Sequence, residues 1–140
     1  MIQNAAVLGA GSWGTALAIA LADRELDVVL YGNEQNVCDE INKSCSNERY
    51  LPGVELPQNI KGSVDISEAA SREFILLVVP SQVARLVLKE LADAGPSPET
   101  IIVSCTKGLD PETGELMHEL IAEFFPKNPV AVLSGPSHAE

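Results

Sequence analysis

Basic residues are scarce in this chain. Its 140 residues include nine lysines and arginines against twenty aspartates and glutamates, which gives a formal net charge of −11 at pH 7. An acidic surface repels phosphate backbones and anionic lipid headgroups, so nucleic acid and anionic membranes are poor partners. Any phosphate-bearing ligand would therefore have to be held by backbone N–H groups and a few well-placed cations.

Long apolar runs are also missing. The first apolar run is broken at Gly9, and the run over residues 17–22 is followed at once by three charged residues. Neither approaches the roughly 20 apolar residues that a membrane-spanning helix needs. The first residues also lack the basic segment with which a signal peptide begins. We therefore expect no membrane span and a cytoplasmic location.

Cysteine and histidine show no metal-site pattern. The three cysteines, Cys38, Cys45 and Cys105, have no C-x-x-C spacing, and the two histidines, His118 and His138, lie far apart in the sequence. Because a metal site needs ligands at characteristic spacings, we predict no bound metal and reduced cysteines. Cys105 lies in an apolar strand pattern and is predicted to be a buried thiol.

Aromatic residues form only 4% of the chain and apolar residues 46%, so we expect a core of Val, Ile, Leu and Ala. Short apolar runs predict strands near residues 5–8, 28–31, 60–63, 74–79, 100–105 and 130–133. Two of these runs do not alternate with polar residues, which is typical of parallel strands covered on both faces. Helical periodicity separates the runs. The sequence thus predicts an α/β fold, a Rossmann-type doubly wound, mostly parallel sheet with helices on both faces.

Apolar spacing also predicts buried helix faces. Two stripes at helical spacing are Trp13, Ala16, Leu17, Ala20 and Leu21, and Val83, Leu86, Val87 and Leu91. A third lies within residues 116–125. Ser81 after Pro80 and Asp110 before Pro111 are residue types that begin helices. The irregular segment 42–59 is predicted to be a long loop near the ligand-binding edge of the sheet.

Residues 9–14 read Gly-Ala-Gly-Ser-Trp-Gly, between an apolar run and an alanine-rich helical pattern. This order of strand, G-x-G-x-x-G and helix is what a dinucleotide diphosphate site needs. Gly9 would allow the tight turn, Gly11 the close approach of the phosphates, and Gly14 the close packing of helix on strand. The free N–H groups at the start of the helix would then face the diphosphate.

Four segments together resemble the bacterial-type NAD(P)-dependent glycerol-3-phosphate dehydrogenase family. They are residues 9–18, 79–81, 106–109 and 134–139, and their order and spacing match that family along essentially the whole chain. The third segment, Thr-Lys-Gly-Leu, and the fourth, Ser-Gly-Pro-Ser-His-Ala, make the resemblance specific. It implies that residues 1–140 form the dinucleotide-binding domain. A C-terminal helical domain, absent from this chain, would supply the catalytic base and most of the substrate pocket.

The resemblance also implies roles for cofactor-binding residues. The backbone at Ser12 and Trp13 would bind the diphosphate beside Gly9, Gly11 and Gly14. Trp13 would shield the cofactor or, alternatively, pack as an ordinary aromatic side chain of a helix. Asn33 stands where the family often carries a basic residue near the adenosine ribose. Ala139 would lie against the cofactor.

Substrate contacts are implied for three residues. Lys107 resembles the lysine that reaches both the cofactor and the phosphorylated substrate, where its charge could polarise the carbonyl of dihydroxyacetone phosphate. Gly135 and Ser137 would also contact the substrate. The resemblance gives His138 no role, and the catalytic residue stays unknown.

Two rules for locating the residue that contacts the adenosine ribose give different answers. Counting about twenty residues from Gly14 reaches Glu34, an acid typical of NAD sites. The strand register instead puts Gly32 at that position, and we follow the register because the strand end fixes the geometry. Gly32 leaves room for a 2′-phosphate, although Asn33 supplies no cation to bind it. We expect NADP or NAD as cofactor and favour NADPH.

The expected function is the cofactor-binding part of an oxidoreductase that interconverts dihydroxyacetone phosphate and glycerol 3-phosphate, a step that feeds glycerophospholipid synthesis. Two alternatives stay open: the cofactor domain of another two-domain hydroxy-acid or sugar-acid dehydrogenase, and a non-catalytic nucleotide-binding module. The 140 residues alone are expected to bind cofactor without turnover. An apolar face left bare by a missing domain would allow two copies to associate as a homodimer.

Overall fold

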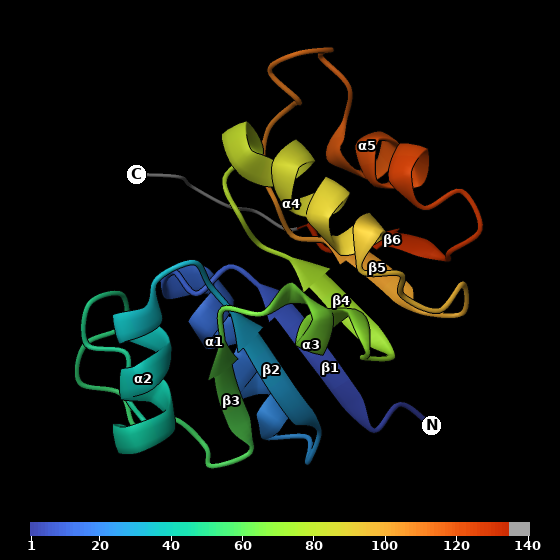
Figure 1. Cartoon of the computed structure of the whole chain (residues 1–140). Helices are drawn as coiled ribbons and strands as arrows, with labels where there is room; N and C mark the ends of the chain where they lie inside the picture. Colours follow the sequence, from blue (N-terminus) through green and yellow to red (C-terminus); the bar gives the residue numbers. More distant parts are fainter. Residues whose placement is uncertain (135–140) are drawn as a thin grey trace.

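A computed structural model describes residues 1–134, which form a six-stranded sheet flanked by helices (Figure 1). The strands are β1 (Asn4–Leu8), β2 (Asp27–Tyr31), β3 (Ile60–Ser63), β4 (Phe74–Leu77), β5 (Ile101–Ser104) and β6 (Val130–Val132). The helices are α1 (Ser12–Ala22), α2 (Gln35–Ser44), α3 (Ile66–Ala70), α4 (Ser81–Asp93) and α5 (Met117–Phe124). Each predicted strand is confirmed within a few residues of its expected ends.

The strands lie in the order β3-β2-β1-β4-β5-β6, and every neighbouring pair is parallel. The chain winds outward from β1 to one edge, returns to β4 beside β1, and winds to the other edge. This is the predicted doubly wound Rossmann-type fold, and its described sheet is parallel throughout. Leu8 pairs with both Tyr31 and Leu77, so the carboxyl ends of the three central strands are level.

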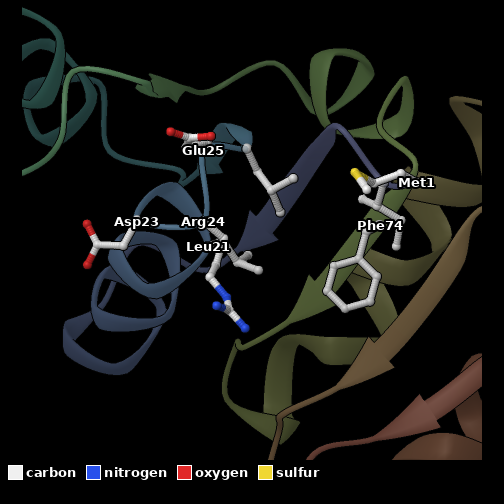
Figure 2. Close-up of a pocket in the computed structure, with 8 residues that line it drawn as sticks. Met1, Leu21, Asp23, Arg24, Glu25 and Phe74 are labelled. Carbon is white, nitrogen blue, oxygen red and sulfur yellow. The ribbon is translucent and has the colours of Figure 1, made fainter.

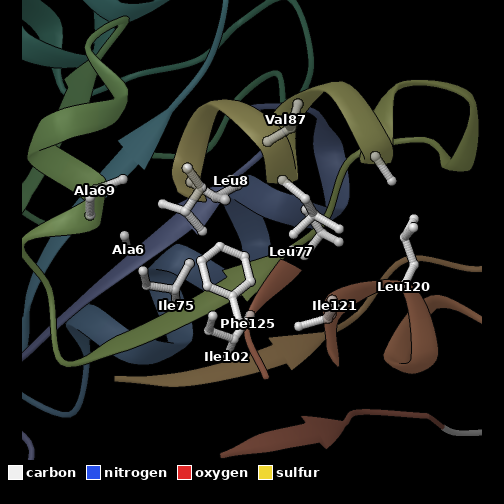
Figure 3. Close-up of a cluster of buried hydrophobic side chains, with 14 of the residues drawn as sticks. Ala6, Leu8, Ala69, Ile75, Leu77, Val87, Ile102, Leu120, Ile121 and Phe125 are labelled. Carbon is white, nitrogen blue, oxygen red and sulfur yellow. The ribbon is translucent and has the colours of Figure 1, made fainter. Parts of the chain in front are cut away.

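Two apolar layers cover the sheet, one on each face. Helices α3, α4 and α5 pack on the face that carries Leu8, Leu77 and Ile102 (Figure 3). Helices α1 and α2 pack on the opposite face, against Val7 and Leu30 among others. Helices on both faces are therefore confirmed. Successive residues of the central strands point alternately into the two apolar layers.

The predicted buried face of α1 is only partly right: Leu17 and Leu21 pack against the core, but Trp13 does not. Trp13 is 55% exposed, whereas the buried residues of this helix are Gly14, Thr15, Ala18 and Ala22. Small side chains let the helix axis approach the strands closely, so packing selects the small face over the larger apolar stripe. The stripe on α4 is half right: Val87 and Leu91 are buried, but Val83 and Leu86 are 41% and 59% exposed. On α5, the predicted face is buried through Met117, Leu120 and Ile121.

One predicted helix start, at Ser81, is confirmed in position although not as a cap, and the other, at Asp110, is wrong. Ser81 is the first residue of α4 and makes no capping hydrogen bond, while Pro80 occupies the N-cap. Residues 111–113 after Asp110 form a turn and no helix, and α5 begins only at Met117. The Asp110 carboxylate instead accepts from Thr113 in that turn and contacts Arg85, as described below.

A shallow hollow lies at the amino-terminal edge of the sheet. It is lined by Met1, Leu21 and Phe74 together with the charged turn after α1 (Figure 2). This edge is opposite to the carboxyl ends of the strands, where open parallel sheets place their ligands. Among residues 1–134, no helix is both long and apolar enough to cross a bilayer.

Candidate functional site

A cleft of about 1530 Å³ opens at the carboxyl ends of the strands. Its lining comes from residues 9–14, 31–34, 78–80, 105–108 and 132–134, with Tyr50 and one face of α4. The cleft spans β1 and β4, where the direction of winding reverses, and this is the place where doubly wound sheets bind nucleotides. The exposed Val83 and Leu86 face this cleft, which explains why part of the apolar stripe on α4 is not buried in the core.

The glycine loop, residues 9–14, is shaped by two close approaches. Gly9 has φ +126°, which side chains disfavour, and its N–H donates to the Tyr31 carbonyl at 2.9 Å. A β-carbon on Gly14 would lie 1.8 Å from the Gly9 carbonyl oxygen, so α1 starts directly against the end of β1. A β-carbon on Gly11 would meet nothing within 4 Å. The loop thus closes tightly on the protein side and leaves open space at Gly11.

The start of α1 faces this space with few competing groups. The N-cap of α1 is Gly11, which has no side chain that could accept from the first N–H groups. The first turn of the helix contains no acidic residue. The first N–H groups of a helix lack partners within the helix and favour anions. Ser12 and Trp13 lie here; the Ser12 hydroxyl donates to the Tyr50 carbonyl at 2.5 Å, and the exposed Trp13 lines the cleft.

Asn47 holds the glycine loop from behind. It is completely buried, and its Nδ2 donates to the Ala10 carbonyl at 3.1 Å and to the Thr15 hydroxyl at 2.9 Å. This residue was not singled out from the sequence. The sequence feature that could have pointed to Asn47 is the irregular segment 42–59, which contains it. This segment was predicted to lie near the ligand-binding edge of the sheet, and its residue Tyr50 does line the cleft.

The end of β2 brings both ribose candidates to one corner of the cleft. Gly32 follows the strand directly, and its N–H donates to the Ser63 carbonyl at 3.0 Å. Asn33 is exposed, and both Asn33 and Glu34 line the cleft. The Arg49 guanidinium donates to the Glu34 carboxylate at 2.7 Å, and the Tyr50 hydroxyl donates to the other Glu34 oxygen. This hydrogen bond to a carboxylate raises the pKa of Tyr50 above its usual value.

Lys107 lies at the other end of the cleft, just after β5. The preceding Thr106 hydroxyl bridges the Leu77 and Val79 carbonyls at 3.1 and 2.8 Å, which fixes the segment to the end of β4. Lys107 itself is exposed and lines the cleft, and Gly108 follows with φ +94°. The structure thereby presents a cation at the carboxyl edge of the sheet, on an anchored segment.

The segment is anchored a second time at Asp110, which is 2% exposed. The Arg85 guanidinium contacts its carboxylate at 2.7 Å, and the Thr113 hydroxyl donates to the same oxygen at 2.7 Å. These hydrogen bonds lower the pKa of Asp110, with the Arg85 contact as the larger cause. Asp110 is therefore a structural anion that ties the segment after Lys107 to α4.

Residues 4–140 match the sequence profile of the family described as NAD-dependent glycerol-3-phosphate dehydrogenase, N-terminus. The chain belongs to this family.

Among the dehydrogenase relatives, the glycerol-3-phosphate dehydrogenase (NAD(P)+) of an Exiguobacterium species is 46% identical over 143 residues, covering 99% of this chain and 42% of the relative. That of Bacillus cereus is also 46% identical, over 96% of this chain and 40% of the relative. The crystal structure of glycerol-3-phosphate dehydrogenase from Coxiella burnetii is 37% identical, with a TM-score of 0.88 over 98% of this chain and 42% of that one. The chain therefore spans about two fifths of the length of these dehydrogenases.

Three of the four dehydrogenase-like segments contribute to one cleft. Residues 9–14, 79–80 and 106–108 line it together, although they are far apart in the sequence. Of the fourth segment only Ser134 is described, and it lines the same cleft. Gly135, Ser137 and Ala139 lie outside the described residues.

Proposed function

We propose that this chain binds NAD or NADP in the cleft and forms the cofactor-binding part of an oxidoreductase that interconverts glycerol 3-phosphate and dihydroxyacetone phosphate. The supporting observation is that the dehydrogenase-like segments gather around the cleft at the reversal of strand order. The relatives described above carry the name of that enzyme. Since the chain spans only part of their length, the activity itself belongs to the proposal.

The glycine loop fits a dinucleotide because the space above Gly11 is open and the first turn of α1 offers N–H groups. We assign the diphosphate to Gly9, Gly11, Ser12, Trp13 and Gly14. The acidic chain can hold this anion because backbone donors and the helix dipole act at short range. The ribose end of the cofactor belongs at Asn33 and the opposite end toward Lys107. Ala139 is assigned to the cofactor by resemblance alone.

The nicotinamide, when bound, supplies or accepts the hydride. The contribution of this chain is then to bind and orient. Lys107 places a positive charge at the carboxyl edge of β5, where it stabilises negative charge developing on the substrate oxygen. Thr106 and Asp110 keep that segment in position. Gly135 and Ser137 are assigned to the substrate by resemblance, and the proton is moved by a base outside this chain.

Trp13 provides a direct test of cofactor binding. It is the single tryptophan of the chain and is exposed at the cleft. Titration with NADH or NADPH should quench its fluorescence and excite the reduced nicotinamide by energy transfer. A saturable signal supports the assignment of the cleft. A folded chain whose Trp13 emission is unchanged by both nucleotides contradicts it.

Activity is tested in the full-length protein with dihydroxyacetone phosphate and NAD(P)H. Replacing Lys107 with Ala should lower kcat/KM by about 100-fold or more, because a charged group acting on the reacting oxygen is lost. Lys89→Ala is the matched control, since Lys89 is an exposed lysine paired with Asp93 on α4. Equal activity of the two variants would remove Lys107 from the mechanism. The complete absence of dihydroxyacetone phosphate reduction would refute the proposed reaction.

The remaining parts of the proposal concern the whole protein. A second, C-terminal domain is supported by the greater length of the relatives. Exposed apolar side chains such as Val132 and Leu133, 54% and 50% exposed, lie at the β6 end of the cleft and offer a surface for that domain or for a second copy in a homodimer. A cytoplasmic location is part of the same proposal.

A further inference from the structure

The corner of the cleft at the end of β2 carries a charge pair that none of the glycine-loop chemistry requires. Glu34 lines the cleft, and its carboxylate is held on one oxygen by Arg49 and on the other by the Tyr50 hydroxyl. Arg49 also stacks over the Tyr50 ring, with 5.3 Å between the guanidinium carbon and the ring centroid. Three side chains from two separate segments thus meet here: Glu34 and Tyr50 line the cleft, and Arg49 is joined to the corner through its contacts with both.

This corner is where the two nicotinamide cofactors differ. NADP carries a phosphate on the adenosine 2′-oxygen, and NAD carries a hydroxyl there. An acid at the end of the second strand accepts hydrogen bonds from the hydroxyl, whereas an arginine nearby accommodates the phosphate. Gly32 and Asn33, the residues directly after β2, supply neither charge. The pair of Glu34 and Arg49 supplies both.

We propose that the Glu34–Arg49 pair sets the cofactor preference of this chain, with Glu34 serving the ribose hydroxyls of NAD and Arg49 serving the 2′-phosphate of NADP. The inference rests on the proposed function, because it assumes a dinucleotide in the cleft. A carboxylate oxygen has two acceptor sites, so Glu34 can receive a ribose hydroxyl while it keeps Arg49 and Tyr50. Arg49 is 61% exposed and has donors left over for a phosphate.

Arg49 and Glu34 have opposite effects on the binding of the 2′-phosphate of NADP. Arg49 attracts it, and Glu34 repels it and competes for the guanidinium. With both present the corner is close to neutral, so either cofactor is accepted. Removing one partner should therefore tilt the preference in a direction set by the partner that remains.

Dissociation constants for NADH and NADPH, measured on this chain through Trp13 fluorescence, test the proposal. Arg49→Ala should weaken NADPH about tenfold and NADH less than about twofold, since a charge-assisted hydrogen bond to the phosphate is lost. Glu34→Gln should tighten NADPH by about threefold, because a like charge is removed, and should weaken NADH by about as much. The ratio of the two constants thus moves in opposite directions in the two variants.

A closely matched control exists on the same molecule. The Lys61–Glu68 pair joins β3 to α3 at 2.8 Å, with side chains 60% and 32% exposed, against 61% and 30% for Arg49 and Glu34. Neither Lys61 nor Glu68 lines the cleft, whereas in the tested pair Glu34 lines it and Arg49 contacts Glu34. Lys61→Ala and Glu68→Gln make the same charge changes and should leave the NADH to NADPH ratio as it is in the unaltered chain.

The possible outcomes distinguish a failure of the Glu34–Arg49 inference from a failure of the proposed function. Opposite shifts of the ratio in the Arg49 and Glu34 variants, with unchanged controls, support the inference. If both nucleotides bind and neither variant shifts the ratio beyond its control, the inference is wrong while the proposed function stands. If neither nucleotide binds the unaltered chain, the cofactor assignment fails and the inference falls with it.

Discussion

Arg85 on α4 contacts Asp110 at 2.7 Å, across 25 positions of sequence, and so ties the segment after Lys107 to the helix beside the cleft. The same guanidinium lies 2.9 Å from Glu112 and 3.6 Å from Glu123. One cation therefore gathers three carboxylates. Of these, Asp110 is the buried one, so it depends most on its partner.

The Asp110 contact predicts a specific pH dependence of stability. Because its pKa is lowered in the folded chain, the ionised carboxylate stabilises the fold fully above its unfolded pKa of about 4. That contribution is lost as the pH falls through the lower, folded pKa. Asp110→Asn should therefore reduce the urea midpoint at pH 7, and the difference from the unaltered chain should narrow below about pH 4.

Asp93→Asn is the matched control for that experiment. It removes the same charge from the Lys89–Asp93 pair, whose side chains are 65% and 70% exposed, and should change the midpoint little at either pH. A constant gap between the Asp110 variant and the unaltered chain from pH 7 to pH 3 would mean that ionisation of Asp110 contributes nothing.

Replacement by alanine should destabilise the chain strongly at Gly14 and only slightly at Gly11. Gly14→Ala places a β-carbon 1.8 Å from the Gly9 carbonyl oxygen, so α1 must shift away from β1. We expect a loss of about 3 kcal/mol or more in the free energy of unfolding. Gly11 has φ −79° and open space at its β-carbon, so Gly11→Ala should fold with a loss below about 1 kcal/mol.

Gly11→Ala should nevertheless weaken NADH and NADPH alike by about tenfold or more, because the added methyl group enters the space assigned to the diphosphate. Urea unfolding and Trp13 fluorescence measure the two properties separately. A Gly11 variant that binds as tightly as the unaltered chain would show that the diphosphate does not approach this residue.

Much of this arrangement was predictable from local sequence. Apolar runs predict the strands best where both faces are buried, as in the central strands β1, β2, β4 and β5. The glycine spacing predicts the turn between β1 and α1. The buried face of α1 was predicted only in part, for a physical reason. The close approach at Gly14 makes the small residues Thr15 and Ala18 the packed ones, and apolar periodicity carries no information on helix-to-sheet distance.

The contacts that organise the cleft were beyond local reasoning because they join distant positions. Asn47 reaches Ala10 over 37 positions, and Arg49 reaches Glu34 over 15. Counting residues reached Glu34 and the strand register reached Gly32, and the structure places both at the same corner of the cleft. Which of the two positions faces the adenosine ribose depends on tertiary contacts, so neither sequence rule alone could settle the question.

Asn47 should be needed for both stability and binding. Replacement by Ala removes two hydrogen bonds from a fully buried site and leaves the Ala10 carbonyl without this donor. We expect a loss of about 1–3 kcal/mol in the free energy of unfolding, with weaker nucleotide binding because the glycine loop is less well held. Asn36→Ala on the exposed side of α2 is the control. An Asn47 variant with unaltered midpoint and affinity would show that the loop holds its shape without this contact.

Cys105 should be the cleft residue that resists alkylation. It lies just after β5, is 7% exposed, and burial raises the pKa of its thiol to about 11. At pH 8 the pKa exceeds the pH by about three units, so about one thiol in a thousand is ionised, and the thiolate is the reactive form.

Cys45 is only half-buried. In the native chain, iodoacetamide should therefore modify Cys45 at least about tenfold faster than Cys105, as followed by peptide mass spectrometry. In urea the two rates should become similar. Equal rates in the native chain would contradict the burial of Cys105, and equal rates only after unfolding would show that the folded sheet, and not the local sequence, protects this thiol.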